Sequence, residues 1–391
     1  MPSSLAGRHS GQFGLNGLVQ AEYGFLDLHI SGVARKYPPA MDEEAILSAT
    51  QSDVPLDGAE QAKALGIDPL AFLPPVAAIC HPFLLMLFHI LVGPPGSQPS
   101  WTNILMAAIV LICALGLPLV GLVVACRPAL PPGIRRLAYA AVVSPTLYVF
   151  LGVVQGMINS LLSDPWVWCV LWLAATAFAL AMARGKPQRM TGWRIARWRV
   201  AHGISAAVLC AYILFHLANH LTGLFGPSTH AAVMDMGRTV YRAPVIEPAL
   251  VLLFLFQAGS GLWLAWWWSG TAQDVYRTFQ IASGLYLSVF VVGHMNSVFL
   301  YARTYLGIPT DWNFATGAPT GLIHDPWNIR LVPHYALGVF LVLSHLASGL
   351  RVVLIAHGAE PRLINRLWAA GVVVSGLIAA AIIAGMCGVR I

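Results

Sequence analysis

The chain has 391 residues, of which 58% are hydrophobic and only 10% are charged, and its mean hydropathy is +0.71. Soluble domains carry about 25% charged residues, so this composition excludes a water-soluble globular protein and indicates an integral membrane protein surrounded by lipid. The net charge of +6 therefore does not indicate a nucleic-acid partner.

An acidic segment precedes the apolar part of the chain. Residues 1–70 contain nine acidic and four basic residues, and the remainder contains seven acidic and eighteen basic residues. The segment lacks the apolar stretch of a secretory signal. We therefore expect residues 1–69 to form a cytoplasmic acidic segment.

Nine apolar segments follow, and each has about the 20 residues that a helix needs to cross a bilayer. They show neither charged faces at helical spacing nor the alternation typical of a closed barrel. We predict an all-α integral membrane protein of about nine transmembrane helices, with a four-helix block over residues 70–190 and a five-helix bundle over residues 191–391. The expected spans are 70–93, 103–126, 136–160, 165–183, 200–223, 245–268, 279–302, 333–356 and 366–388.

The basic residues beside these spans predict the orientation. With the amino terminus in the cytoplasm, thirteen lysines and arginines flank the inner ends of the spans and five flank the outer ends. Short cytoplasmic loops carry such an excess of basic residues. We expect a bacterial inner membrane protein whose carboxyl terminus lies outside.

Thirteen histidines are unusual in so apolar a chain. His216 and His294 each lie 17 residues after an arginine at the inner end, Arg199 or Arg277, in spans of the same direction. At 1.5 Å per residue, both imidazoles lie about 25 Å from that end. An imidazole inside a membrane is costly without a partner and indicates a functional site. We therefore expect His216 and His294 to share one depth in the outer half of the membrane.

A second polar layer is expected nearer the cytoplasm, on the two spans of opposite direction. There the segment QAGSGLW, residues 257–263, parallels HLASGLR, residues 345–351. Gly261 and Gly349 lie one turn after Gln257 and His345 and could let a flat macrocycle approach the helix backbone. Small residues at this spacing also occur wherever membrane helices pack closely.

Haem suits this pattern better than zinc does. Zinc takes three or four ligands, often including thiolate or carboxylate, whereas haem iron needs one or two axial imidazoles. The six cysteines lie in apolar runs without CxxC spacing, which argues against a disulfide framework or a thiolate metal site. The alternative is a proton relay through His216, His220 and His294.

Residues 197–388 resemble the five-helix cytochrome b membrane anchor of succinate dehydrogenase and fumarate reductase. The resemblance implies a haem b with His216 and His294 as axial ligands of an outer site. It also implies an inner haem, for which His345 supplies one ligand and Gln257 stands where the family has the second histidine. The resemblance rests on RVAHGISAAVLCAYILFH (199–216), LFLFQAGSGLW (253–263), RTFQIASGLYLSVFVVGH (277–294), YALGVFLVLSHLASGLR (335–351) and RLINRLWAAGVVVSG (362–376).

The glutamine leaves three alternatives for the inner site, because glutamine is a poor iron ligand. The site is empty, or His345 alone binds a five-coordinate haem, or another side chain such as His202 supplies the missing ligand. We therefore expect one six-coordinate haem b and at most one weaker haem.

The resemblance further implies electron transfer between a cytoplasmic redox partner and the membrane quinone pool. The chain has no GxGxxG fingerprint before a helix and no cysteine cluster for an iron–sulfur centre, so flavoprotein and iron–sulfur subunits on the cytoplasmic side are the expected partners. Candidate quinone contacts lie near both ends of the spans: Arg199, Ser205, Arg277, Ser283 and Glu247.

A non-catalytic membrane scaffold or sensor that keeps the cytochrome b fold with one haem or none is the competing interpretation, because fold does not fix function. The missing histidine and the four additional spans both favour it. In the four-helix block we expect no paired ionisable groups. For His230, His324 and His334, in or beside outer loops, we expect solvated interfacial roles.

Overall fold

The computed structural model describes residues 69–182 and 192–391, with side chains from residue 196 onward in the second range. The predicted acidic segment lies outside the described residues except for Pro69. The described residues all belong to one compact unit. The described residues form helices joined by turns and contain no strand, which confirms the prediction of an all-α membrane protein.

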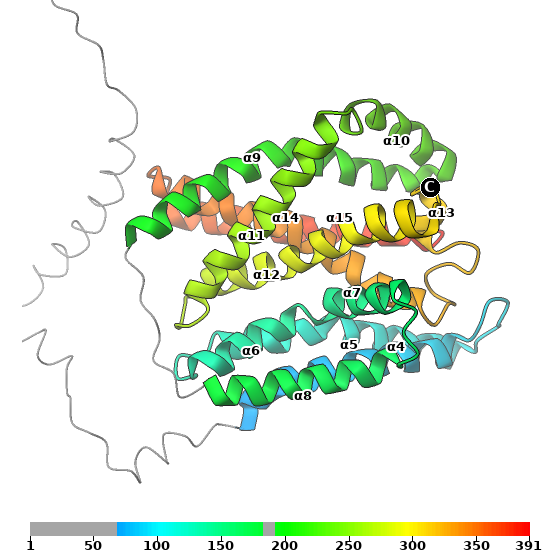
Figure 1. The fold of residues 1–391 in the computed structure, drawn as a ribbon, viewed down its shortest axis with the longest axis horizontal. Helices are drawn as coiled ribbons and strands as arrows, with labels where there is room; N and C mark the ends of the chain where they lie inside the picture. The colour runs from blue at the N-terminus through cyan, green and yellow to red at the C-terminus, as the bar shows by residue number, and fades with distance from the viewer. Residues whose placement is uncertain (1–68, 183–191) are drawn as a thin grey trace, which may run out of the picture. The chain divides into compact units, whose positions relative to one another are not determined.

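The helices follow the order of the predicted spans (Figure 1). Their bounds are η1 Pro69–Phe72, α4 Leu73–Val92, α5 Trp101–Ala125, α6 Pro132–Val142, α7 Ser144–Met157, α8 Asp164–Met182, α9 Gly192–Thr222, η2 Gly223–Phe225, α10 Pro227–Tyr241, α11 Ile246–Trp268, α12 Val275–Met295, its π-helical continuation η3 Asn296–Leu306, α13 Trp312–Thr316, η4 Asn328–Arg330, α14 Leu331–Ala356 and α15 Pro361–Met386.

Within the described ranges, eight helices are long and apolar enough to cross a membrane, and a ninth crossing requires α6 and α7 to act as one bent span. The continuous span expected over residues 136–160 is wrong, because the chain bends by 70° between these two helices. Pro145 lies in the first turn of α7, and a proline ring clashes with the carbonyl four residues earlier. The polar backbone at this break is covered by protein, as lipid requires, since residues 141–146 are buried.

Many apolar side chains point away from the protein. Ile112 on α5 is 68% exposed and Leu173 on α8 is 62% exposed. Such a surface is stable only in contact with lipid. Polar groups instead lie inside or at the helix ends, where Asp274 caps α12 by accepting a hydrogen bond from the Arg277 backbone N–H at 3.0 Å.

Five helices, α9, α11, α12, α14 and α15, form a ring. Each of these helices packs against its neighbours in the order α9, α11, α12, α14, α15, and α15 returns to α9. Between the described parts of α9 and α12, and likewise of α11 and α14, there is no comparably close packing. The two pairs of helices that carry the predicted polar layers therefore face each other across the ring.

The four-helix block contacts this ring through α6 and α7, which lie against α12 (Figure 1). A buried ion pair joins the two parts: Arg330 Nη1 lies 2.6 Å from Asp164 Oδ2, and the two side chains are 8% and 17% exposed. The Arg330 guanidinium also stacks 4.5 Å from the Tyr148 ring centre, and Gln155 donates to Asp164. The block therefore supplies one member of this ion pair, and Arg330 of the five-helix bundle supplies the other.

Removing one member of this pair should destabilise the protein strongly. Asp164→Asn or Arg330→Met should each lower the free energy of unfolding by about 3 kcal/mol, because the remaining charge stays buried. The free energy of unfolding of the double variant should fall by less than the sum of the decreases in the two single variants. Denaturant unfolding in detergent gives the free energy of unfolding of the wild type, the two single variants and the double variant. Additive decreases in the single variants would show that the contact does not contribute to stability.

Candidate haem site

The structure brings His216 and His294 together across the ring of helices. The centres of their imidazole rings lie 6.1 Å apart, with 71° between the ring planes. His216 lies on α9 and His294 in the last turn of α12. The two histidines that the sequence predicts at one depth therefore also lie close together in space.

The separation suits two ligands of one metal atom. An imidazole nitrogen lies about 1.1 Å from its ring centre and a metal–imidazole bond is about 2.0–2.1 Å, so two rings on opposite sides of a metal have centres roughly 6.3 Å apart. Neither ring makes a side-chain hydrogen bond to another described residue, which leaves nitrogen lone pairs for a ligand. The described residues contain no group of three or more His, Cys, Asp or Glu side chains suited to a metal ion.

An aromatic side chain one turn earlier supports each histidine. Tyr212 stacks on His216 with 5.7 Å between ring centres, and Phe290 stacks on His294 at 5.8 Å with 7° between the planes. Residues i and i+4 share one helix face, so the sequence pattern itself positions these pairs. A side chain at Gly338 on α14 would overlap the Phe290 ring, so this glycine is needed for the arrangement.

Several buried polar atoms near this pair have no hydrogen-bond partner. They are Asn219 Oδ1, His220 Nδ1 and His230 Nδ1, and the His220 ring lies 4.7 Å from the His216 ring and 5.5 Å from that of His230. Buried polar groups are normally satisfied. A cofactor with polar substituents, or ordered water, would supply the missing partners.

His230 and His334 do not have the solvated roles expected from sequence. They are 2% and 3% exposed, because α10, a helix that the hydropathy pattern did not predict, packs His230 against Trp312 at 4.6 Å. His334 packs at 4.6 Å from Phe290. Only the third histidine of that group, His324, is partly exposed, and it contacts the Gly93 carbonyl at 3.1 Å.

The inner layer contains a complete hydrogen-bond network around Gln257. Ser205 donates to Gln257 Oε1, and Gln257 Nε2 lies 2.9 Å from His202 Nε2. An amide nitrogen only donates, so His202 Nε2 is the acceptor and Nδ1 carries the proton that reaches Ser260 Oγ at 2.8 Å. Both nitrogens of His202 are therefore engaged, which disfavours His202 as a replacement iron ligand.

His345 is oriented differently, by Ser283. Ser283 Oγ donates to the Gln280 carbonyl at 3.1 Å and lies 2.9 Å from His345 Nδ1, so it accepts from that nitrogen. The Nε2 lone pair then remains, which is the arrangement typical of a metal-binding histidine. The ring also packs against Gly284, where an added Cβ would lie 3.1 Å from His345 Cε1.

Gly261 and Gly349, the two glycines that could let a macrocycle approach the helix backbone, have different surroundings. An added Cβ at Gly261 would lie 3.3 Å from His202 Cε1, whereas nothing lies within 4 Å of one at Gly349. Gly261 therefore makes room for the His202 ring, and Gly349 faces open space.

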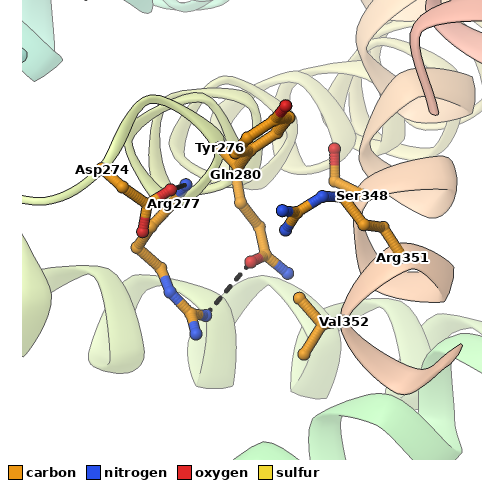
Figure 2. Close-up of a pocket in the computed structure, with 7 residues that line it drawn as sticks. All are labelled: Asp274, Tyr276, Arg277, Gln280, Ser348, Arg351 and Val352. Atoms are coloured by element: carbon orange, nitrogen blue, oxygen red, sulfur yellow. Dashed lines mark hydrogen bonds between the residues drawn. The ribbon is translucent and has the colours of Figure 1, made fainter. Parts of the chain in front are cut away.

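Most of the candidate quinone contacts already have partners within the protein. Ser205 and Ser283 belong to the inner polar layer, and Glu247 forms an ion pair with Arg303 at 2.8 Å. Arg199 lies 6.0 Å from the Trp268 ring centre. Arg277 instead lines a small cavity between α12 and α14 (Figure 2).

The four-helix block contains a further buried polar site, around His81. His81 on α4 is fully buried, and neither of its ring nitrogens has a hydrogen-bond partner. Its ring lies 6.1 Å from that of Tyr148, beside the break before α7. Nearby in sequence, Ser144 and Thr146 hold buried hydroxyls that also lack partners. Hydropathy alone cannot reveal such a site, since it reports no contacts between distant helices.

The stability of the protein should depend on the protonation of His230, which lies outside the membrane spans. Burial lowers its pKa below 6.5, Arg238 lowers it further, and Asp311 opposes the shift. The unfolded chain then binds more protons below pH 6.5, so the free energy of unfolding should fall as the pH drops from about 7.5 to 5.5, by at most about 1.4 kcal/mol per pH unit for this one group. Thermal unfolding of the wild type and of His230→Asn should show a weaker pH dependence in the variant; identical pH profiles would contradict this.

Comparison of the chain with protein-family models, with curated proteins and with solved structures finds no match. The positions of the histidines and of the polar groups around them are therefore the basis for inferring a function.

Proposed function

We propose that the five-helix bundle binds one haem b between His216 and His294 and transfers electrons between a cytoplasmic redox partner and the membrane quinone pool, as cytochrome b anchors of succinate dehydrogenase do. The observation that carries this proposal is the 6.1 Å separation of two imidazoles on helices that face each other across the ring. Haem b would supply reversible one-electron chemistry there.

The protein side chains have separate roles in this proposal. His216 and His294 hold the iron, and Tyr212 and Phe290 keep the two rings in place by stacking on them. The apolar interior excludes water, which tunes the reduction potential. His220, with a buried nitrogen that lacks a partner, would orient the polar edge of the cofactor.

The contacts of the inner layer favour one haem per chain rather than two. The Gln257 amide bonds to Ser205 and to His202, so every polar group around it has a partner without a metal. His345 keeps its Nε2 lone pair but lacks a histidine opposite. Of the three alternatives for this layer, the geometry favours the empty one.

The same network favours one competing function, a membrane scaffold or sensor. A path for electrons across the whole membrane would use both layers, and Gln257 interrupts the inner one. Electron exchange with quinone on one side needs only the outer haem. Reduction by quinol separates the two functions: a haem that a quinol reduces supports electron transfer, and a haem inert to quinol supports the scaffold.

The haem assignment is tested with His216→Ala and His294→Ala. The purified wild type should show the absorption spectrum of a six-coordinate low-spin haem b, and each variant should lose nearly all of it, because a single imidazole does not hold the low-spin state. The matched control is His89→Ala, which removes a membrane histidine in α4, outside the ring. Retention of the spectrum in either variant would refute the assignment.

Gln257→His should add a second haem. The new imidazole would stand opposite His345, whose Nε2 is available, so the haem content should rise from about one to about two per chain. Gln257→Leu is the control, since it breaks the same hydrogen bonds without adding a ligand and should leave the content at about one. Equal haem contents in the two variants would show that residue 257 does not face the inner site.

A further inference from the structure

A small cavity lies at the end of the ring that we predict to face the cytoplasm. It has a volume of about 50 Å³ and is lined by Asp274, Tyr276, Arg277, Gln280, Ser348, Arg351 and Val352. A water molecule occupies roughly 10–15 Å³ of such volume, so about three to five waters or one oxyanion of similar size would fit. Figure 2 shows the Gln280 amide between the two guanidinium groups.

The lining is rich in hydrogen-bond donors held in fixed positions. Arg351 stacks 3.7 Å from the Tyr276 ring centre, and its Nε donates to Asn365 Oδ1 at 2.8 Å. Arg277 Nη1 donates to Gln280 Oε1 at 3.1 Å, which turns the Gln280 amide nitrogen away from Arg277. The terminal amino groups of Arg351 have no acceptor among the described residues.

The lining of the cavity also carries a net positive charge. Among the described residues that line it are two arginines, Arg277 and Arg351, and one acidic residue, Asp274. The Asp274 carboxylate already accepts the Arg277 backbone N–H at the start of α12. Two arginines within reach of one small space, with a single carboxylate used as a helix cap, favour a negatively charged ligand over a neutral one.

We propose that Arg277, Gln280 and Arg351 bind a phosphate oxyanion whose negative charge is not offset by a cationic group of the same ligand, such as the headgroup phosphate of an anionic phospholipid. Basic pockets between membrane helices on the cytoplasmic side suit such headgroups. This site is independent of the proposed haem, so the two proposals fail or succeed separately.

The test uses the full chain in detergent and native mass spectrometry with phosphatidylglycerol or with phosphatidylcholine of the same acyl chains. Phosphatidylglycerol should bind more tightly, and Arg351→Gln or Arg277→Gln should weaken its binding about ten-fold. Arg362→Gln, which removes the same charge from an exposed position on the adjacent helix α15, should change it less than about two-fold. Arg351→Lys keeps the charge but loses the planar guanidinium, so its affinity for phosphatidylglycerol should lie between those of the wild type and of Arg351→Gln.

Inorganic phosphate identifies the source of the ligand. If it displaces phosphatidylglycerol from the wild type, free phosphate also occupies the site; if it does not, the lipid headgroup is the ligand, and both results support an oxyanion site. Equal binding of the two lipids, or equal losses in the Arg351→Gln and Arg362→Gln variants, would overturn the proposal. Each variant must retain the wild-type helical circular dichroism. Gln280→Leu removes one donor from the site without a change of charge and should also weaken the binding of phosphatidylglycerol.

Discussion

A polar group inside a membrane is stabilised mainly by partners that the protein supplies, because lipid offers no hydrogen bonds. The architecture of this chain follows from that constraint. Asp164 and Arg330 neutralise each other where the two parts of the molecule meet. Gln257 is enclosed by Ser205 and His202. His216 and His294, by contrast, meet each other without such hydrogen bonds, and this difference is the reason for proposing that this pair binds a ligand.

The sequence predicted the features that depend on position along a helix. Counting residues from Arg199 and Arg277 placed His216 and His294 at one depth, and hydropathy identified the membrane helices. Because both histidines occupy long helices of the same direction, a shared depth combined with packing around a common ring is sufficient to bring them together.

The sequence could not predict contacts between distant segments. Arg330 is one of the five basic residues that the sequence places at the outer ends of the spans, but nothing in the sequence indicates its partner Asp164, which lies 166 positions earlier. His202 was weighed as a replacement ligand, yet the fold directs both of its nitrogens to α11. The break between α6 and α7 was missed because the apolar run continues through Pro145, and hydropathy does not register the backbone hydrogen bond that a proline removes.

The two polar layers of the ring thus have different chemistry on one scaffold. In the outer layer two imidazoles lie at a separation suited to two ligands of one metal atom, and in the inner layer Gln257 belongs to a hydrogen-bond network with Ser205 and His202. The most direct test is the haem content of the purified wild-type protein, measured as the pyridine haemochrome against protein concentration. We predict one haem b per chain; a protein without haem would contradict the proposed site, and two haems per chain would contradict the role assigned to Gln257.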